Sequence, residues 1–327
     1  LGASTVSGVL TVTSNGAITD SGVLAVTGQT NLTAGAANNI TLDNANNFST
    51  VAVASGNNVT LNDTNGIILG GSTISGNLVV TAAGTITDSG NVAVTGTTSL
   101  TAGGANDITL NNANNFGGAV SVVSGNNVTL NDTNAIDLGA STVSGNLVVT
   151  AAGAISDSGA LAVTGTTTLT PGAANSVVLD QAGNDFTGAF SVTNGTNVTV
   201  VDASGLNLGP IAITGNLLAT ATTGDITNTG GALTIGGNST FTADAAAASI
   251  TVNNAGNNFT GTVGFAGAGG LANVTVLDTT ALDLGATTLT GNLVVTAAGI
   301  TDSGDLVVGG TTTLTPGAAN SVVLDQA

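Results

Sequence analysis

The chain is built from tandem copies of one segment. A Leu-Gly pair opens each of five copies, which follow one another at spacings of 68, 69, 70 and 76 residues, and the final stretch 310–327 is identical to 165–182. Near-identical copies favour an architecture in which each unit packs on the next, so we expect one continuous domain cut from a longer repetitive protein. The copies are residues 1–68, 69–137, 138–207, 208–283 and 284–327, the last of them partial.

Short runs of alternating apolar residues fill each copy. In the first copy Leu10 and Val12 form one such run, and Ile40 and Leu42 form another. A period of two is typical of strands with one buried face. Clusters such as SNG and NDTN separate the runs, and Gly, Asn and Asp are turn residues. Because Glu, Lys, Arg and Met are absent, four of the best helix formers are missing, and the pattern predicts an all-β chain.

A parallel β-solenoid accounts best for strands and repeats together. We expect three turns in each copy, which gives about 23 residues per turn and about 14 turns in the chain. Like residues would then stack on like, forming aliphatic ladders inside and rows of Asn or Thr at the turns. A barrel or a sandwich is the alternative, but it needs antiparallel hairpins with varied pairing.

Two further features bear on the core. Copy four is irregular around Pro210 and 264–273, where we expect a bulge or a protruding loop. One Phe follows an Asn-bearing turn in each of the first four copies, and we predict that this ring plugs a corner of the core. These residues are Phe48, Phe116, Phe186 and Phe259.

The composition excludes most chemistry. His, Cys, Lys, Arg, Tyr and Glu are all absent, and many of the acids recur with the repeat, unlike the residues of an active site, so we expect no catalytic residues and no enzyme. Without Lys and Arg the chain should not bind nucleic acid. Thr, Asn and Gly interrupt every apolar cluster, so no membrane insertion is expected. A cysteine-free chain suits export through an oxidising compartment.

The acids recur in two series, and we interpret both as turn caps that accept backbone N–H bonds. The alternative is loose Ca²⁺ binding, although the bidentate Glu of a calcium loop is missing, so no specific metal or cofactor site is predicted. With a formal charge of −18, divalent cations could also bundle neighbouring chains laterally. The first series is Asp20, Asp88, Asp157 and Asp302, with Asn228 in copy four, and the second is Asp63, Asp132, Asp202 and Asp278.

Two phrases carry a family resemblance. GNNVTLNDTNAIDLGASTVSG at 125–145 and NLVVTAAGAISDSGALAVTGTTTLT at 146–170 resemble the repeat regions of filamentous-haemagglutinin-like exoproteins and other giant bacterial surface adhesins. The resemblance extends over essentially the whole chain. It implies a right-handed β-helix shaft exported to the bacterial cell surface.

The expected function is therefore structural: an extracellular fibre or stalk, as in a filament, a biofilm matrix or an adhesin shaft. Its expected partner is the chain itself, through end-to-end stacking of open strand edges or lateral bundling. The alternative is an adhesin module that contacts glycans or host surfaces through the rod or through 264–273, which carries Phe265. A remote alternative is an ice-binding solenoid, suggested by Thr-x-Thr triplets such as those in 166–170.

Overall fold

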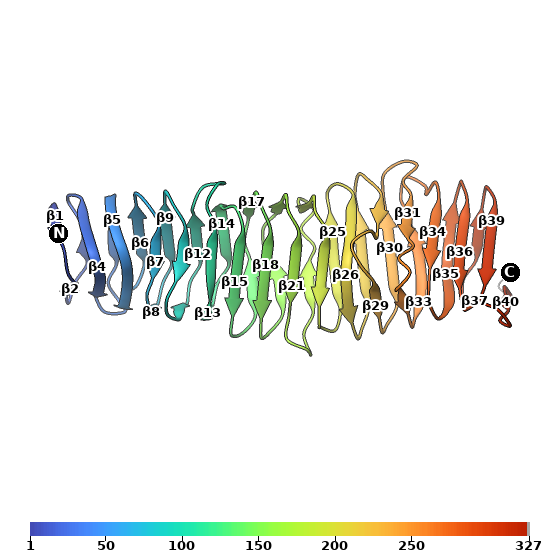
Figure 1. Ribbon diagram of the computed structural model, residues 1–327, viewed down its shortest axis with the longest axis horizontal. Coiled ribbons are helices and arrows are strands. Elements are labelled where there is room, and N and C mark those ends of the chain that lie inside the picture. Colours follow the sequence, from blue (N-terminus) through green and yellow to red (C-terminus); the bar gives the residue numbers. More distant parts are fainter. Residues whose placement is uncertain (326–327) are drawn as a thin grey trace. The chain divides into compact units, whose positions relative to one another are not determined.

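The computed structural model describes residues 1–325, and its strands coil into a parallel β-solenoid of about sixteen turns (Figure 1). The predicted fold class is confirmed. Within the described residues there is no helix, and hence none that could cross a membrane. The chain divides into two compact units, unit 1 (Leu1–Val163) and unit 2 (Thr164–Ala327).

Two long parallel ladders form unit 1, and each has eight strands. Ladder 1 consists of β2 (Leu10–Thr13), β4 (Leu24–Thr33), β5 (Ile40–Ser55), β7 (Ile67–Leu69), β10 (Ile86–Asp88), β13 (Ile108–Phe116), β15 (Val128–Asp132) and β18 (Leu147–Ala151). Ladder 2 consists of β3 (Ile18–Thr19), the first part of β5, β6 (Val59–Asp63), β9 (Leu78–Ala82), β12 (Thr98–Thr101), β14 (Val120–Ser124), β16 (Ile136–Leu138) and β19 (Ile155–Asp157).

Short strands complete each turn, and they do not stay on one side of the coil. The first set follows ladder 2 in the chain, the middle set follows ladder 1, and the last set follows ladder 2 again. The first set is β1 (Ser4–Val6) with the start of β4 and residues 47–48 of β5. The middle set is β8 (Ser72–Ile74), β11 (Val92–Val94) and the end of β13, and the last is β17 (Ser141–Val143) and β20 (Leu161–Val163).

The core is aliphatic, and polar rows run along the turns. In β6 the side chains alternate between buried and half-buried positions, as the period of two predicts. At one turn the backbone N–H of Asn58 donates to Asn39 Oδ1 (3.2 Å), that of Asn77 to Asn58 Oδ1 (3.0 Å) and that of Thr97 to Asn77 Oδ1 (2.9 Å). Each amide thus bonds the next turn, which confirms the predicted Asn rows.

The turns differ from the prediction in length and phase. Stacked residues are separated by 18 positions at Thr50 and Ile68 but by 24 at Ile226 and Ile250, so 23 residues per turn was too many and 14 turns too few. Three turns do not complete a copy either. Leu78 lies above Val59, Ile40 and Ile18 in ladder 2, whereas its repeat equivalent Leu10 belongs to ladder 1. Corner geometry sets the length of each turn, so the aliphatic and Asn rows form, but equivalent residues of successive copies do not stack on one another.

Unit 2 repeats the plan. Leu293 lies above Val274, Ile250 and Ile226, while its equivalent Leu217 belongs to the other ladder. Ladder 3 is β22 (Val177–Leu179), β25 (Val198–Asp202), β27 (Leu217–Ala221), β30 (Ser239–Ala243), β33 (Thr262–Ala266), β35 (Ala281–Leu289), β37 (Gly299–Asp302) and β40 (Val322–Val323). Ladder 4 is β21 (Thr167–Thr170), β24 (Phe190–Thr193), β26 (Leu206–Ile213), β28 (Ile226–Thr227), β31 (Ile250–Val252), β34 (Val274–Leu277), β36 (Leu293–Ala297) and β39 (Thr312–Pro316).

The short strands of unit 2 are β23 (Asp185–Phe186), β29 (Leu233–Ile235), β32 (Asn258–Phe259) and β38 (Leu306–Val308). The register shifts between Val263 and Phe265 in β33, where the sequence predicts an irregular copy four, but the equivalent β24 of copy three shifts in the same way between Phe190 and Val192. The ring of Phe265 is 2% exposed and stacks on Phe241 with ring centroids 5.8 Å apart. The aromatic residue of 264–273 therefore belongs to the core, where a binding partner cannot contact it.

Candidate functional site: the aspartate corners

The most elaborate polar structure lies where the short strands change sides. Phe48 ends the first set of short strands, and the next turn passes over it as the corner 63–66 rather than as a strand. Its backbone N–H therefore lacks a carbonyl partner above it and donates instead to Asp63 Oδ2 (2.6 Å). The other carboxylate oxygen of Asp63 accepts the N–H of Asn65 (2.8 Å). The side chain thus closes its own turn and caps the strand below.

This arrangement, here called the corner cap, recurs in each of the first four copies. The Phe N–H to carboxylate distances are 2.9 Å for Phe116 and Asp132, 3.2 Å for Phe186 and Asp202, and 3.3 Å for Phe259 and Asp278. All four rings are at most 1% exposed, which confirms that they are core residues, and all four acids are at most 3% exposed.

Burial dominates the electrostatics of the corner caps. It raises the pKa of Asp63, Asp132, Asp202 and Asp278 above the ordinary value of 3.8, while backbone N–H bonds act in the opposite direction. At Asp202 the neighbouring charge of Asp185 raises the pKa further. A chain without Lys, Arg or His therefore stabilises its buried acids with backbone N–H groups and, at Asp202 and Asp278, with the hydroxyl groups of Ser204 and Thr280.

The first acid series forms a second bonded group. Asp88 accepts the N–H groups of Asn111 and Asn112 (3.1 Å each) and the side-chain amide of Asn114 (2.8 Å). Asp20 is bonded in the same way by Asp43 N (3.2 Å), Asn44 N (3.3 Å) and Asn46 Nδ2 (2.7 Å). These are the turn-capping bonds that the sequence predicted.

Asn46 and Asn114 carry a role that sequence reasoning missed. Both are fully buried, and their Oδ1 atoms accept the backbone N–H of Leu24 and Val92 respectively, at 2.8 Å. Each amide therefore links an acid of the turn below to the start of a short strand. The available signal was position, since each Asn stands two residues before the corner Phe.

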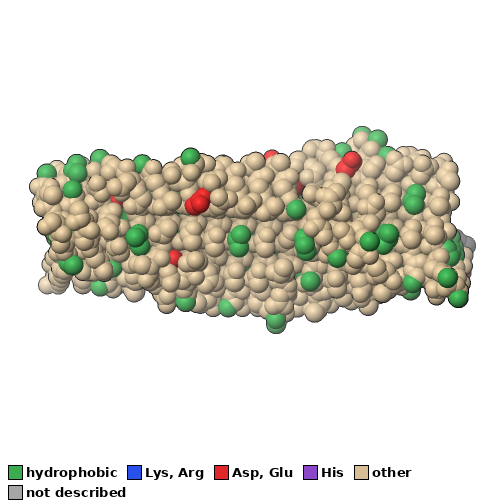
Figure 2. Space-filling view, viewed as in Figure 1, with side chains coloured by type: hydrophobic (Ala, Val, Ile, Leu, Met, Phe, Trp, Pro, Cys, Tyr) green, Lys and Arg blue, Asp and Glu red, His purple; other side chains and the backbone are tan. Residues whose placement is uncertain are grey.

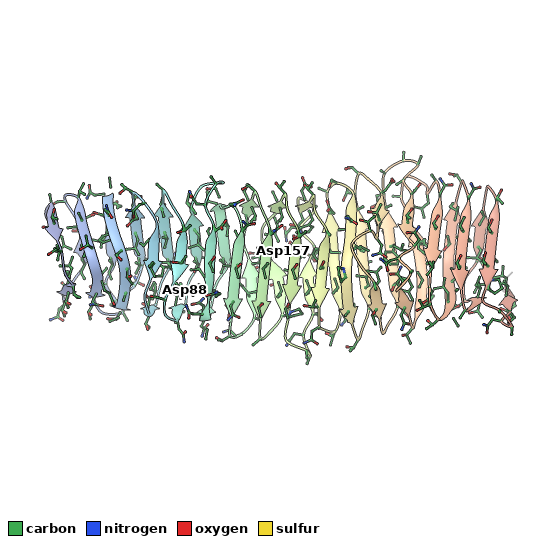
Figure 3. All side chains as sticks on the ribbon, viewed as in Figure 1. Asp88 and Asp157 are labelled. Carbon is green, nitrogen blue, oxygen red and sulfur yellow. The ribbon has the colours of Figure 1, made fainter. Side chains whose placement is uncertain are left out.

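The remaining members of the first series vary. Asp302 accepts the N–H of Asp325 at 3.0 Å, and Asp157, at the end of β19, is 8% exposed (Figure 3). Asn228, which stands where the other copies have Asp, donates to the carbonyl groups of Leu208 (3.0 Å) and Gly231 (2.7 Å). Its buried Oδ1 has no hydrogen-bond partner.

The acids do not assemble into a metal centre in the described part of the chain. Among residues 1–325 no three acidic side chains come together as ligands of one ion. Asp20, Asp63, Asp88 and Asp132 each meet N–H donors, which are partners of a carboxylate but not of a cation. Loose Ca²⁺ binding stays a prediction.

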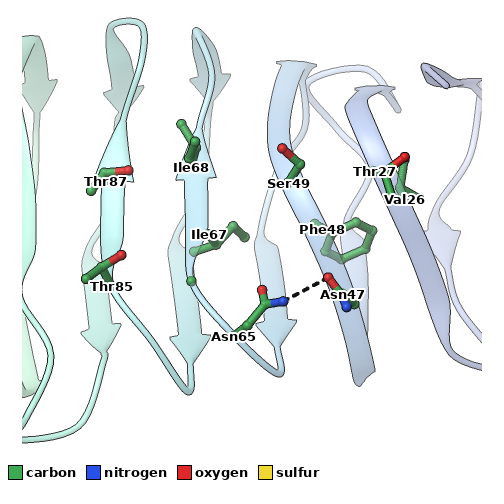
Figure 4. Close-up of a pocket in the computed structure, with 11 residues that line it drawn as sticks. Val26, Thr27, Asn47, Phe48, Ser49, Asn65, Ile67, Ile68, Thr85 and Thr87 are labelled. Carbon is green, nitrogen blue, oxygen red and sulfur yellow. Dashed lines mark hydrogen bonds between the residues drawn. The ribbon is translucent and has the colours of Figure 1, made fainter. Parts of the chain in front are cut away.

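A hollow of about 510 Å³ opens beside the first corner cap. Figure 4 shows Phe48, Ile67 and Ile68 among hydroxyl and amide side chains, with Asn65 bonded to Asn47 (3.0 Å). No charged side chain lines it. A smaller hollow in copy two contains Val94, Thr95 and Asn115, the equivalents of Val26, Thr27 and Asn47. In the face shown by Figure 2, exposed apolar side chains are scattered rather than gathered into a patch.

The chain matches a family described as "Repeats of unknown function (DUF5649)" over residues 1–55, 56–123, 125–193, 195–266 and 271–327. These matches extend over nearly all of it, so the chain belongs to this family. The matched segments recur with the period of the copies, and each boundary falls before the Leu-Gly pair of the next copy. No curated protein and no solved structure matches the chain.

Proposed function

We propose that the chain is a passive structural shaft, part of an extracellular fibre or stalk of a bacterial surface or matrix protein. The observation that carries the proposal is the pair of unbroken parallel ladders in each unit, to which every copy adds strands of the same kind. A coil of this kind changes length with copy number, and backbone hydrogen bonds along its axis resist bending. The resemblance to adhesin shafts and the absence of Cys support a location outside the cell.

The lack of catalytic side chains supports the non-enzymatic part of the proposal. The acids that recur are engaged with backbone amides, and Ser and Thr have no His or Lys beside them because the chain contains neither. Its polar side chains form hydrogen bonds with the turns of the chain itself.

The test has two arms. Variants that lack one whole internal copy should be shorter by about 17 Å when imaged by electron cryomicroscopy, since three and a half turns at about 4.8 Å separate equivalent strands. In producing cells, an epitope inserted at the turn 36–37 should be accessible to antibody without permeabilisation. An unchanged length would contradict the shaft, and an epitope accessible only after lysis would contradict the location.

The hollow beside the first corner cap favours a second candidate, contact between the shaft and uncharged glycans. Hydroxyl and amide groups around exposed Ile68 suit a neutral polyol, and a chain of charge −18 repels anionic sugars. Binding to a neutral glycan array that Thr87→Val weakens would support it, and an array without signal would dismiss it. The segment 264–273 contributes little to this candidate because Phe265 is buried.

A further inference from the structure

A row of threonines crosses the outer side of ladder 4 in unit 2. Its members lie above one another on β28, β31, β34, β36 and β39, strands that follow one another along the unit (Figure 1). The row is Thr227, Thr251, Thr275, Val294 and Thr313. Val294, the one member without a hydroxyl, has the same branched shape as Thr. Threonines that are scattered in the sequence are therefore aligned by the coil.

A second row runs beside the first. Leu277 pairs with Thr296, and Thr296 pairs with Thr315, each two residues along its strand from a member of the first row. Neighbouring turns are about 4.8 Å apart, and the two rows are about 6.6 Å apart, because every second side chain of a strand faces the same way. The outer side of ladder 4 thus carries a two-dimensional array of hydroxyl and methyl groups.

Acidic residues lie outside the two rows, although the chain has a formal charge of −18. Asp225 stands at the corner before Thr227, where its carboxylate accepts the N–H of Ser249 (2.8 Å). Asp278 follows Leu277 but is only 3% exposed. A partner that lies on the two rows therefore meets hydroxyl and apolar groups rather than ions.

The array is held in place before anything binds to it. The first four members of the first row are half-buried, and branched side chains such as Thr and Val have few χ1 rotamers. At the adjoining corner the N–H of Asn292 donates to Asn273 Oδ1 (3.0 Å), and that of Thr311 donates to Asn292 Oδ1 (2.8 Å). These bonds keep successive turns in register, so a ligand of the array orders few side chains when it binds.

We propose that this array, here called the threonine face, binds ice. The oxygen atoms of ice repeat along one lattice axis at nearly the interval between neighbouring strands, and a hydroxyl both donates and accepts hydrogen bonds as a lattice water does. Hydroxyl groups on successive turns therefore match successive lattice positions, while the methyl groups between them release water when they are covered. An uncharged face suits ice, whose surface offers hydrogen bonds but no counter-ions. This activity does not depend on the proposed function as a shaft.

Growth of ice in a solution of the purified chain tests the proposal, through thermal hysteresis of single crystals and the rate of recrystallisation. Thr275→Lys places a long charged side chain in the middle of the threonine face. Thr199→Lys is the matched control, because Thr199 is also half-buried and has the same Asn-Val-Thr context. It lies in ladder 3 instead, between Val178 and Leu218.

We expect the unaltered chain and Thr199→Lys to shape ice crystals and to slow recrystallisation, and we expect Thr275→Lys to lose both effects. An unaltered chain that leaves ice growth unchanged would overturn the proposal, as would an equal loss in both variants. Light scattering reports the competing occupant, a second copy of the chain. A molar mass that Thr275→Lys halves would assign the face to pairing and contradict ice binding. Circular dichroism of both variants checks that the coil is intact.

Discussion

The corners of copy two and copy four both provide an acceptor for the buried N–H of a short strand, but different side chains surround that acceptor. In copy two, Asp88 accepts three N–H donors, one of which is Asn114 Nδ2. In copy four Asn228 replaces the acid, and the amide of Asn257 turns to the carbonyl of Val252 (3.0 Å) instead. In both corners the buried Asn two residues before the corner Phe, here called the inner Asn, accepts the N–H of a short strand. Asn114 accepts it from Val92 at 2.8 Å, and Asn257 accepts it from Leu233 at 2.9 Å.

The difference separates what the corner requires from what it tolerates. The inner Asn is required, because a buried strand N–H without an acceptor is costly. The acid is not required, because Asn228 takes the place of Asp88 in copy four, although its Oδ1 atom is then buried without a hydrogen-bond partner. The recurring Asp is therefore a hydrogen-bond acceptor of the backbone, which explains its recurrence without any ligand.

The largest expected effect comes from removing the inner Asn. Asn114→Ala leaves the Val92 N–H and the Asp88 carboxylate short of partners, and we expect a loss of about 3 kcal/mol in the free energy of unfolding. Asn257→Ala should cost less, about 2 kcal/mol, because no carboxylate depends on it. Urea unfolding measures both. Asn115→Ala, at an exposed neighbouring position, is the control. An equal loss of unfolding free energy there would contradict the special role of the inner Asn.

Exchanging Asp and Asn at the equivalent positions 88 and 228 should destabilise both corners. Asp88→Asn replaces one acceptor oxygen with a donor that faces N–H groups, and Asn228→Asp places a carboxylate against the carbonyls of Leu208 and Gly231. We expect a loss of about 2 kcal/mol at neutral pH for each exchange. Thermal unfolding of the two single variants checks this. A stabilised Asn228→Asp variant would contradict this, because it would show that the corner of copy four accommodates the Asp of the other copies better than its own Asn.

Unpartnered buried hydroxyls offer a gain rather than a loss. Among residues 1–325, the buried side-chain atoms without a hydrogen-bond partner, other than Asn228 Oδ1, belong to equivalent residues that face the aliphatic core in four copies: Thr30, Thr98, Thr167 and Ser239.

Thr98→Val keeps the shape of the side chain and removes the unpaired hydroxyl, so we expect a gain of about 1 kcal/mol. Thr101→Val, on a half-buried side chain at the other end of β12, should change unfolding little. A destabilised Thr98→Val variant would show that the hydroxyl has a partner after all.

The smallest expected effect is a dependence on pH. Because burial raises the pKa of the four corner-cap acids above 3.8, their favourable contribution is complete below 3.8 and is lost as pH rises through the raised values. Asp107 acts in the opposite sense because the N–H of Asn127 lowers its pKa, but its side chain is only half-buried and its charge is screened by solvent. Melting temperature should therefore rise slightly as pH falls from 7 towards 4.

Asp132→Asn should make this rise smaller, whereas the exposed Asp43→Asn should leave it unchanged. A melting temperature that falls over the same interval would contradict the assignment of burial as the main cause. Measurements at constant ionic strength keep the repulsion among the other acids comparable.

Local pattern was enough to predict the strands, the turn residues and the parallel coil, because a period of two and a turn composition determine which backbone each segment prefers. It also identified the corner Phe and both Asp series, since they recur. It could not place Asn46 and Asn114, because each accepts a hydrogen bond from a strand more than twenty residues away, and this bond forms only once the coil has closed.

Only the tertiary structure decided how the copies stack. Leu10 and Leu78 are equivalent residues of successive copies but lie in different ladders, because the residues needed to pass each corner add up to about three and a half turns per copy. Sequence identity between copies determined that the units are alike. The sum of strand and corner lengths around the coil, which cannot be read from one copy, determined which ladder the strands of each copy join.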